Sequence, residues 1–309
     1  MRDGPATIRA VRALFVVLAV QVALGLLLIT LVATDNLPFT GGSGEAGASE
    51  RVPRAKVDRF DGAAAHRGVR RQVALGPRPA GSEASRRLAQ RIRATLPGGR
   101  FQAVPGGLRN VIGRVPGRAP GRVVVVGAHY DTKDVPGFVG ANDGASGTAI
   151  LMRLARTLRP RTLRSTIVFI AFDGEESPAG TPDDQFEQRG LRGSKVAAPG
   201  YANARAMVLL DFVGERGLRI PREATSDQRL WSALRSAARR AGVGPVFPDE
   251  EQGGLLDDHI PFIREGVPAI DLIDFDFPCF HRRCDDLSRI SPRSLDAVGE
   301  TMLELLPRL

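Results

Sequence analysis

The sequence contains few cysteine, histidine and aromatic residues, and this scarcity limits the kinds of binding site that the chain can form. Two cysteines and four histidines occur among 309 residues, and aromatic residues make up 6% of the chain. A zinc site built from thiolates needs more ligands than two cysteines provide. Cys279 and Cys284 lie five residues apart and outside any CxxC pattern, so both a small-loop disulfide and two free thiols remain open.

Long basic runs are also absent, although the chain carries a net charge of +9. The 43 basic residues are nearly all arginine, and they are scattered along the sequence without aromatic residues between them. Surfaces that bind nucleic acid gather basic residues in patches or stripes. We therefore expect no nucleic-acid partner, and we assign the excess positive charge mainly to solubility.

One long apolar run is present near the N-terminus, at residues 13–33. It has 21 residues, contains no charge, and follows three arginines, so it is long enough to span a bilayer. A cleaved signal peptide is the alternative, but its apolar region is about 7–15 residues and ends at a small-x-small site. The arginines place residues 1–12 in the cytosol and the rest of the chain on the extracytoplasmic side. The sequence thus predicts a membrane-anchored protein.

The body of the protein is expected to follow a tether. Residues 34–55 are rich in glycine, serine and proline and have little to bury, which predicts a flexible linker. The remainder, 43% hydrophobic and 25% charged over the whole chain, has the composition of an ordinary globular protein. We expect one catalytic domain over residues 56–309.

Short β-branched runs alternate with helical patterns in this domain. The runs predict buried strands at 122–127, 166–172, 206–212 and 269–273. The helical patterns lie at 82–95, 145–158, 227–241 and 292–306. This alternation predicts an α/β fold with a mixed, mostly parallel central sheet and helices on both faces.

Acidic residues and histidine follow the predicted strands. The sequence reads GAHYD after the first strand, DGEE after the second and LLDF at the end of the third. In open α/β sheets, ligands bind outside the carboxyl ends of the strands. Three separate strands are therefore expected to bring carboxylates and an imidazole to one edge of the sheet.

Two imidazoles and three carboxylates form the central candidate set: His129, Asp143, Glu176, Asp211 and His281. Carboxylates gathered without counter-charges repel one another, so such a cluster holds a cation or shares protons. Nitrogen and oxygen ligands together suit zinc, whereas magnesium and calcium favour oxygen alone. Taken singly, a histidine or aspartate at a strand end is more often a cap or hydrogen-bond partner.

Glu175 and Glu176 are expected to have separate roles, because consecutive residues leaving a strand point in different directions. One can bind the metal while its neighbour faces the substrate and transfers a proton. The alternative is an exposed acidic pair that is favoured at a helix start by the helix dipole.

The order of short motifs resembles the zinc aminopeptidase superfamily and, within it, the animal-type glutaminyl-peptide cyclotransferase family. The motifs are HYD (129–131), GANDGASG (140–147), FDGEE (172–176), LRGS (191–194), LLD (209–211), DDHIPF (257–262), GVP (266–268) and a histidine at 281. The resemblance runs from about residue 110 to the C-terminus. It implies a zinc exopeptidase-like version of the fold predicted above.

For the metal, the resemblance implies that Asp143, Glu176 and His281 hold one zinc ion. In the aminopeptidase branch a second zinc would be held by His129 and Asp211, with Asp143 bridging the two ions. Cyclotransferases keep similar residues but use a single zinc. We therefore expect one zinc, or two if the chain is an aminopeptidase.

For the activity, the resemblance implies conversion of the N-terminal glutamine of peptides or proteins to pyroglutamate with release of ammonia. Glu175 would move the proton, Asp211 and Asp257 would orient the amine, and Phe280 would wall the substrate pocket in place of the family's tryptophan. The doublet in DDHIPF favours this activity. The alternative is a zinc aminopeptidase, in which Glu175 acts on water that attacks the first peptide bond. A non-catalytic binding module would need a damaged site, and no expected ligand is missing.

Some polar residues have no clear place in this scheme. His259 is expected to pack or hydrogen-bond rather than bind metal. Asp271 is unusual inside a core strand and could face the pocket. Asp285 and Asp286 could orient His281 or cap the following turn. Trp231 is expected to be structural.

Overall fold

The computed structural model describes residues 52–309. Within this range no helix combines the length and the apolar character needed to cross a membrane. The expected anchor at 13–33, the cytosolic segment at 1–12 and nearly all of the expected linker lie outside the described residues.

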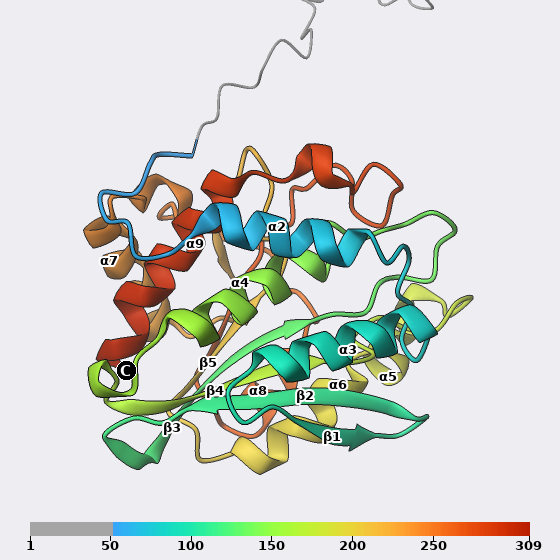
Figure 1. The fold of residues 1–309 in the computed structure, drawn as a ribbon, viewed down its shortest axis with the longest axis horizontal. Helices are drawn as coiled ribbons and strands as arrows, with labels where there is room; N and C mark the ends of the chain where they lie inside the picture. Colours follow the sequence, from blue (N-terminus) through green and yellow to red (C-terminus); the bar gives the residue numbers. More distant parts are fainter. Residues whose placement is uncertain (1–51) are drawn as a thin grey trace, which may run out of the picture. The chain divides into compact units, whose positions relative to one another are not determined.

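The central sheet has six strands in the order β1-β2-β4-β3-β5-β8 (Figure 1). These are β1 (Arg100–Val104), β2 (Leu108–Val115), β3 (Ala119–His129), β4 (Ser165–Phe172), β5 (Ala206–Leu210) and β8 (Ala269–Leu272). Strands β4, β3, β5 and β8 are parallel, whereas β1 and β2 form an antiparallel edge. The predicted mixed, mostly parallel sheet is confirmed. The four parallel strands are those predicted, and the antiparallel pair was missed.

Helices cover both faces of this sheet (Figure 1). One face carries α2 (Gly62–Val73), α3 (Glu83–Thr95), α4 (Ala145–Thr157), α7 (Gln228–Ala241) and α9 (Pro292–Leu305). The other face carries α6 (Arg192–Ala197) and α8 (Ile260–Arg264). Outside the central sheet lie a short helix, α5 (Phe186–Arg189), and two short parallel strands, β6 (Arg222–Glu223) and β7 (Glu251–Gln252).

The strands contribute to two cores because successive side chains point to opposite faces. In β3, Val124 and Val126 join the larger core beneath α2, α4 and α9, while Val125 joins the smaller core beneath α6 and α8. Every residue of β4 is buried, so this strand is covered on both sides. Burial of each such aliphatic side chain contributes about 1.5–3 kcal/mol, which is why the strands appear as unbroken β-branched runs.

The helix ends follow local capping chemistry. Ser82 accepts a hydrogen bond from Ser85 N at the start of α3, and Asp227 accepts one from Leu230 N at the start of α7. Gly242 ends α7 with a φ of 84°, a left-handed conformation that glycine adopts without strain. The predicted helices therefore agree with the structure to within about a residue at each end.

The folded body includes residues that the sequence assigned to the tether. Val52 is 1% exposed and belongs to the larger core, and the amide of Lys56 donates to the carbonyl of Ala241 at 2.8 Å. Helix α2, which the sequence analysis did not identify, packs against α4 and α9. The fold thus begins at or before Val52.

Two glycines, one just before α4 and one in its first turn, let this helix lie close to the sheet edge. A Cβ on Gly147 would lie 2.0 Å from the carbonyl oxygen of Leu210, and Gly144 precedes the helix with a φ of 79°. Only glycine permits this approach and this turn. The start of α4, with the residues before it, therefore lies directly beside the ends of β3 and β5.

Candidate metal centre

The side chains that the sequence singled out meet at the carboxyl edge of the parallel strands. His129 ends β3, Asp211 follows β5, and Glu175 and Glu176 follow β4 after a two-residue turn. The other two come from loops, the segment before α4 and the segment after β8: Asp143 and His281. All except His281 are buried, and its side chain is 28% exposed.

The potential ligand atoms form two groups that share Asp143. In the first, His129 Nε2 lies 3.1 Å from Asp143 Oδ1 and 3.3 Å from Asp211 Oδ1. In the second, His281 Nε2 lies 3.1 Å from Glu176 Oε1 and 3.5 Å from Asp143 Oδ2. Asp143 thus offers one oxygen to each group.

Both groups fit a zinc ion. Ligand atoms about 2.0–2.1 Å from zinc at the tetrahedral angle lie about 3.3 Å apart, which matches the separations in both groups. Asp143 Oδ2 and Glu176 Oε1 are buried without a hydrogen-bond partner, which is costly unless a cation completes them. The nitrogen and oxygen donors are those that zinc accepts.

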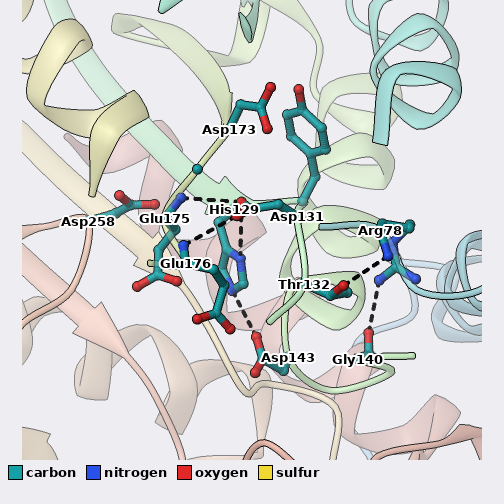
Figure 2. A network of polar contacts seen from close by, with 12 residues as sticks. Arg78, His129, Asp131, Thr132, Gly140, Asp143, Asp173, Glu175, Glu176 and Asp258 are labelled. Atoms are coloured by element: carbon teal, nitrogen blue, oxygen red, sulfur yellow. Dashed lines mark hydrogen bonds and ion pairs between the residues drawn. The ribbon is translucent and has the colours of Figure 1, made fainter. Parts of the chain in front are cut away.

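Asp131 fixes the backbone of the glutamate pair (Figure 2). Its two carboxylate oxygens accept from the amides of Glu175 at 3.3 Å and Glu176 at 3.2 Å. The same carboxylate lies 3.7 Å from Nδ1 of His129. The sequence analysis quoted Asp131 within a motif but gave it no role, because its partners follow a different strand.

Asp285 holds the loop that carries Asp143. Its Oδ1 accepts from Asn142 N at 2.7 Å and its Oδ2 from Asp143 N at 3.0 Å. Burial, followed by the charge of Asp143, raises the pKa of Asp285 to about 7. Asp285 therefore contacts the loop of Asp143 through these bonds. The two roles considered from the sequence, orienting His281 and capping the following turn, did not include this contact. Asp286 does cap the following turn, because it accepts from Ser288 N at 2.8 Å.

Arg78 lies fully buried behind the same loop (Figure 2). Its guanidinium donates to the carbonyls of Val139 at 2.8 Å and Gly140 at 3.2 Å, and its amide donates to Thr132 Oγ1 at 2.9 Å. Burial lowers the pKa of Arg78 to about 10, against the opposing charge of nearby aspartates that include Asp143. The sequence analysis missed Arg78, since it stands outside every motif.

The loop that carries His281 is closed by a disulfide between Cys279 and Cys284. This resolves the two alternatives left open by the sequence. His281 itself has a φ of 51°, a left-handed conformation that costs a non-glycine residue about 1–2 kcal/mol. Phe280 stacks on its ring with centroids 3.8 Å apart. The crosslink and the stacked ring thus restrain a strained ligand.

A cavity of about 320 Å³ opens beside the two donor groups. Its polar lining includes Glu175, Glu176, Asp211, Asp257 and His281. Its apolar lining consists of Phe186, Phe212, Leu255, Leu256, Ile273, Phe275 and Phe280. Phe280 lies in the expected pocket wall, with 39% of its surface exposed.

Neighbouring carboxylates in this cavity have pKa values pushed in opposite directions. Burial and then the charge of Glu176 raise the pKa of Glu175 well above its usual value. Burial opposes ionisation of Glu176 too, but the neighbouring imidazole of His281 lowers the pKa of Glu176. Burial raises the pKa of Asp211 to about 7, against His129. Such a split between adjacent acids is what proton transfer requires.

A second polar network lies behind the cavity. His259 Nε2 lies 2.8 Å from Thr225 Oγ1 and 3.3 Å from Glu223 Oε2, which confirms a hydrogen-bonding role. Asp271 is buried 3.7 Å from Nδ1 of His259, and burial, followed by Asp257, raises its pKa well above the usual value. Asp271 is not among the residues that line the cavity.

Trp231 packs edge-on against Phe247 in the core, as expected of a structural residue. It lies on the face covered by α7, and none of the cavity's lining residues belongs to that helix. The pocket's aromatic wall is therefore made entirely of phenylalanine, and the one tryptophan of the chain stabilises the fold.

The sheet, the shared donor set and the adjacent buried carboxylate define the class as a mixed α/β protein of zinc exopeptidase type. The model of peptidase family M28 matches residues 110–306, and the chain belongs to that family.

Individual relatives include both of the activities considered above. The chain is 30% identical over 222 residues to a glutaminyl-peptide cyclotransferase-like protein of Mus musculus, covering 62% of this chain and 57% of that one. A solved glutaminyl cyclase of Porphyromonas gingivalis is 33% identical with a TM-score of 0.71, covering 82% of this chain and 99% of that one. A leucine aminopeptidase precursor of Bacteroides thetaiotaomicron is 28% identical with a TM-score of 0.73, again covering 82% and 99%. The chain spans about 57–61% of the length of the first curated cyclotransferases it matches.

Proposed function

We propose that this chain is a zinc-dependent glutaminyl-peptide cyclotransferase that converts the N-terminal glutamine of peptides or proteins to pyroglutamate and releases ammonia. The observation that carries the proposal is the mixed lining of the cavity, in which Glu175, Asp211 and Asp257 occur together with phenylalanine and aliphatic side chains. The likeness to the solved glutaminyl cyclase over nearly its whole length supports the same activity.

Asp143, Glu176 and His281 would hold the zinc ion of this enzyme. When bound, zinc supplies a Lewis acid that polarises a carbonyl oxygen of the substrate. A set of three protein ligands would be that of a catalytic rather than a structural zinc site. The partial exposure of His281 keeps this group accessible from the cavity.

The protein's own residues would carry the proton. Asp211 and Asp257 hold and orient the α-amine of the substrate, and Glu175 takes the amine proton as the nitrogen attacks the γ-carbonyl carbon. A new carbon–nitrogen bond closes the ring, the bond to the amide nitrogen breaks, and Glu175 returns the proton to the departing ammonia. Because both reacting groups belong to one residue, orientation supplies much of the rate.

The apolar lining would exclude water and help to select the N-terminal residue of the substrate. A volume of about 320 Å³ is near the lower limit of small-molecule sites, so it suits a single terminal residue. Phe280 and Phe275 line its rim, where the following residues of a peptide would leave the cavity.

A zinc aminopeptidase is the second candidate, and one observation favours it. Asp143 offers separate oxygens to two donor groups of equal spacing, which would suit two ions, with His129 and Asp211 holding the second. Glu175 would then take a proton from the attacking water and pass it to the new amine. The likeness to the leucine aminopeptidase precursor supports this alternative equally well in fold.

Mass spectrometry of the products separates the two candidates. The purified zinc-loaded chain is incubated with a peptide that begins with glutamine and with a matched peptide that begins with leucine. Loss of one ammonia from the first peptide alone supports the cyclotransferase. Release of a free N-terminal residue supports the aminopeptidase, and the absence of both products overturns both. Metal analysis of the same sample gives the number of zinc ions per chain.

We further propose that residues 13–33 anchor the protein in a membrane, with residues 1–12 in the cytosol and a tether leading to a catalytic domain outside. The Cys279–Cys284 disulfide supports an oxidising, extracytoplasmic compartment, since cytosolic thiols stay reduced. Protease treatment of intact cells tests this arrangement. Digestion of the catalytic domain together with a membrane-bound remnant is expected, whereas a mature chain that starts after residue 33 would indicate a cleaved signal instead.

A further inference from the structure

The opposite edge of the parallel sheet carries arginine where the metal centre carries carboxylate. Arg164 directly precedes β4, Arg205 directly precedes β5, and Arg122 lies near the start of β3. The strand order places these three starts next to one another, close to the C-terminal end of the chain in Figure 1. Arg229 in the first turn of α7 joins them. We call this group the arginine pocket.

The arginine pocket encloses a cavity of about 430 Å³. Its lining also includes Arg308, which pairs with Glu304 at 3.5 Å, and the apolar residues Ala206, Leu230, Ala233, Pro268 and Leu309. The arginines therefore border a hollow rather than a flat face. This shape distinguishes the cluster from the arginines scattered elsewhere on the surface.

Counter-charges are scarce in this pocket. Its one lining carboxylate side chain, Asp227, is used to cap α7 by accepting from Leu230 N at 2.7 Å. Over residues 52–309, no ion pair engages Arg164, Arg205 or Arg229. These like charges repel one another, and an anion in the cavity would relieve that repulsion.

Arg122 gives a second sign of an unfilled site. Its Nη2 donates to the backbone oxygen of Leu309 at 2.9 Å, but its buried Nε has no hydrogen-bond partner. Desolvation, followed by the charges of Arg164 and Arg205, lowers the pKa of Arg122. An oxygen of a bound anion would satisfy this buried donor and offset the charge of the two neighbouring cations.

We propose that the arginine pocket binds a phosphate group. Guanidinium forks match the geometry of phosphate oxygens and bind them in pairs, and several arginines together select a multiply charged anion. The group could belong to a soluble phosphate or to the headgroup of an anionic phospholipid, since both present the same oxygens. The pocket lies seven residues along β3 from His129, roughly 23 Å at about 3.3 Å per residue, so its ligand does not compete with a peptide substrate.

Calorimetric titration of the full-length, zinc-loaded chain in a neutral detergent tests the proposal. One arm adds inorganic phosphate and pyrophosphate, and the other adds phosphatidylglycerol in mixed micelles, both near physiological salt. The key variant is Arg164→Gln with Arg205→Gln, since both side chains are exposed and tolerate replacement without loss of the fold. The matched control is Arg100→Gln with Arg114→Gln, which removes the same charge from an exposed part of the sheet edge away from the pocket.

Saturable binding by the wild type, weakened on the order of tenfold or more in the pocket variant but not in the control, is the expected result. Saturation by the soluble anions identifies a soluble ligand, and saturation by the lipid micelles alone identifies a headgroup. Absence of saturation in both arms overturns the proposal, as does equal weakening in both variants. Turnover of a peptide substrate is expected to be unchanged in the pocket variant, so a failed anion site and a failed cyclotransferase assignment are distinguished.

Discussion

The two edges of the parallel sheet differ in how their charges are held. At the carboxyl edge, the backbone amides of the ligand-bearing segments donate hydrogen bonds to the carboxylates of Asp131 and Asp285, so the buried carboxylates are held in place and their charge is left for a cation. At the amino edge, exposed arginines lie around a hollow with few hydrogen bonds to fix them. The carboxylates are thus held in one arrangement before any ligand binds, whereas the exposed arginines can adjust to a ligand.

Replacement of Glu175 by glutamine is expected to have the largest effect. The variant loses the proton-transferring carboxylate and should lower kcat by about 10²–10⁴-fold while it binds a normal amount of zinc. Steady-state kinetics with metal analysis measures both quantities. Arg205→Gln, at the other edge, is the control and should keep full turnover. Equal activity of wild type and Glu175→Gln would remove the proposed role of this residue.

Arg78→Met is expected to have the next largest effect, on stability. It leaves the carbonyls of Val139 and Gly140 without donors and removes a buried cation from several aspartates, at a cost of about 3–5 kcal/mol. Urea unfolding of the zinc-free protein measures the change. Arg164 is exposed and has no ion pair within residues 52–309. The variant Arg164→Gln should therefore change the free energy of unfolding by less than about 0.5 kcal/mol. Similar losses of unfolding free energy in both variants would show that the arginines at the two edges do not differ in their contribution to stability.

Asp285→Ala is expected to weaken zinc binding about 10–100-fold, as is usual for groups that orient metal ligands. The loss of two bonds to the backbone around Asp143 lets this ligand move. Competition with a chromogenic chelator gives the affinity. The neighbouring Asp286→Ala, which disturbs only a turn cap, is the matched control, and an unchanged affinity in Asp285→Ala would count against the positioning role.

Glu223→Gln is expected to have the smallest effect and a defined pH dependence. Burial opposes the charge of Glu223, but bonds from His259, Thr225 and Leu255 lower its pKa to about 2. A carboxylate whose pKa is lowered by folding stabilises the fold at pH values above its pKa in the unfolded state, which is near 4.5. This stabilisation is lost as the pH falls toward 2. The variant should lose about 1.5 kcal/mol near pH 7, with the difference from wild type shrinking between pH 4.5 and 2 in urea titrations. A constant difference over this range would contradict the assignment.

The sequence predicted much of the carboxyl edge because several of its residues directly follow a recognisable strand, although Asp143 and His281 come from loops. His129, Glu176 and Asp211 stand at the ends of β-branched runs, and parallel strands must bring such ends together. Helices α3, α4, α7 and α9 were predicted for a similar reason, since caps and glycine stops are local signals, whereas α2 and the shorter helices were not. Local signals of this kind do not depend on how distant segments pack.

The features that the sequence did not reveal depend on tertiary contacts. Strands β1 and β2 form an antiparallel edge whose partners are set by the sheet order. Arg78 acts through carbonyl oxygens, which carry no side-chain signal. The arginine pocket forms only because residues 122, 164 and 205 stand before strands that become neighbours, so the same strand argument could have found it at the other edge.

The crosslinked loop around His281 also has a consequence for metal capture. Until Cys279 and Cys284 join, the left-handed turn at this histidine is restrained mainly by its stacking on Phe280. The other ligands stand on or beside the sheet and are in position once it folds. We therefore expect the disulfide to favour metal capture, because it restrains the turn that brings His281 Nε2 to within 3.1 Å of Glu176 Oε1.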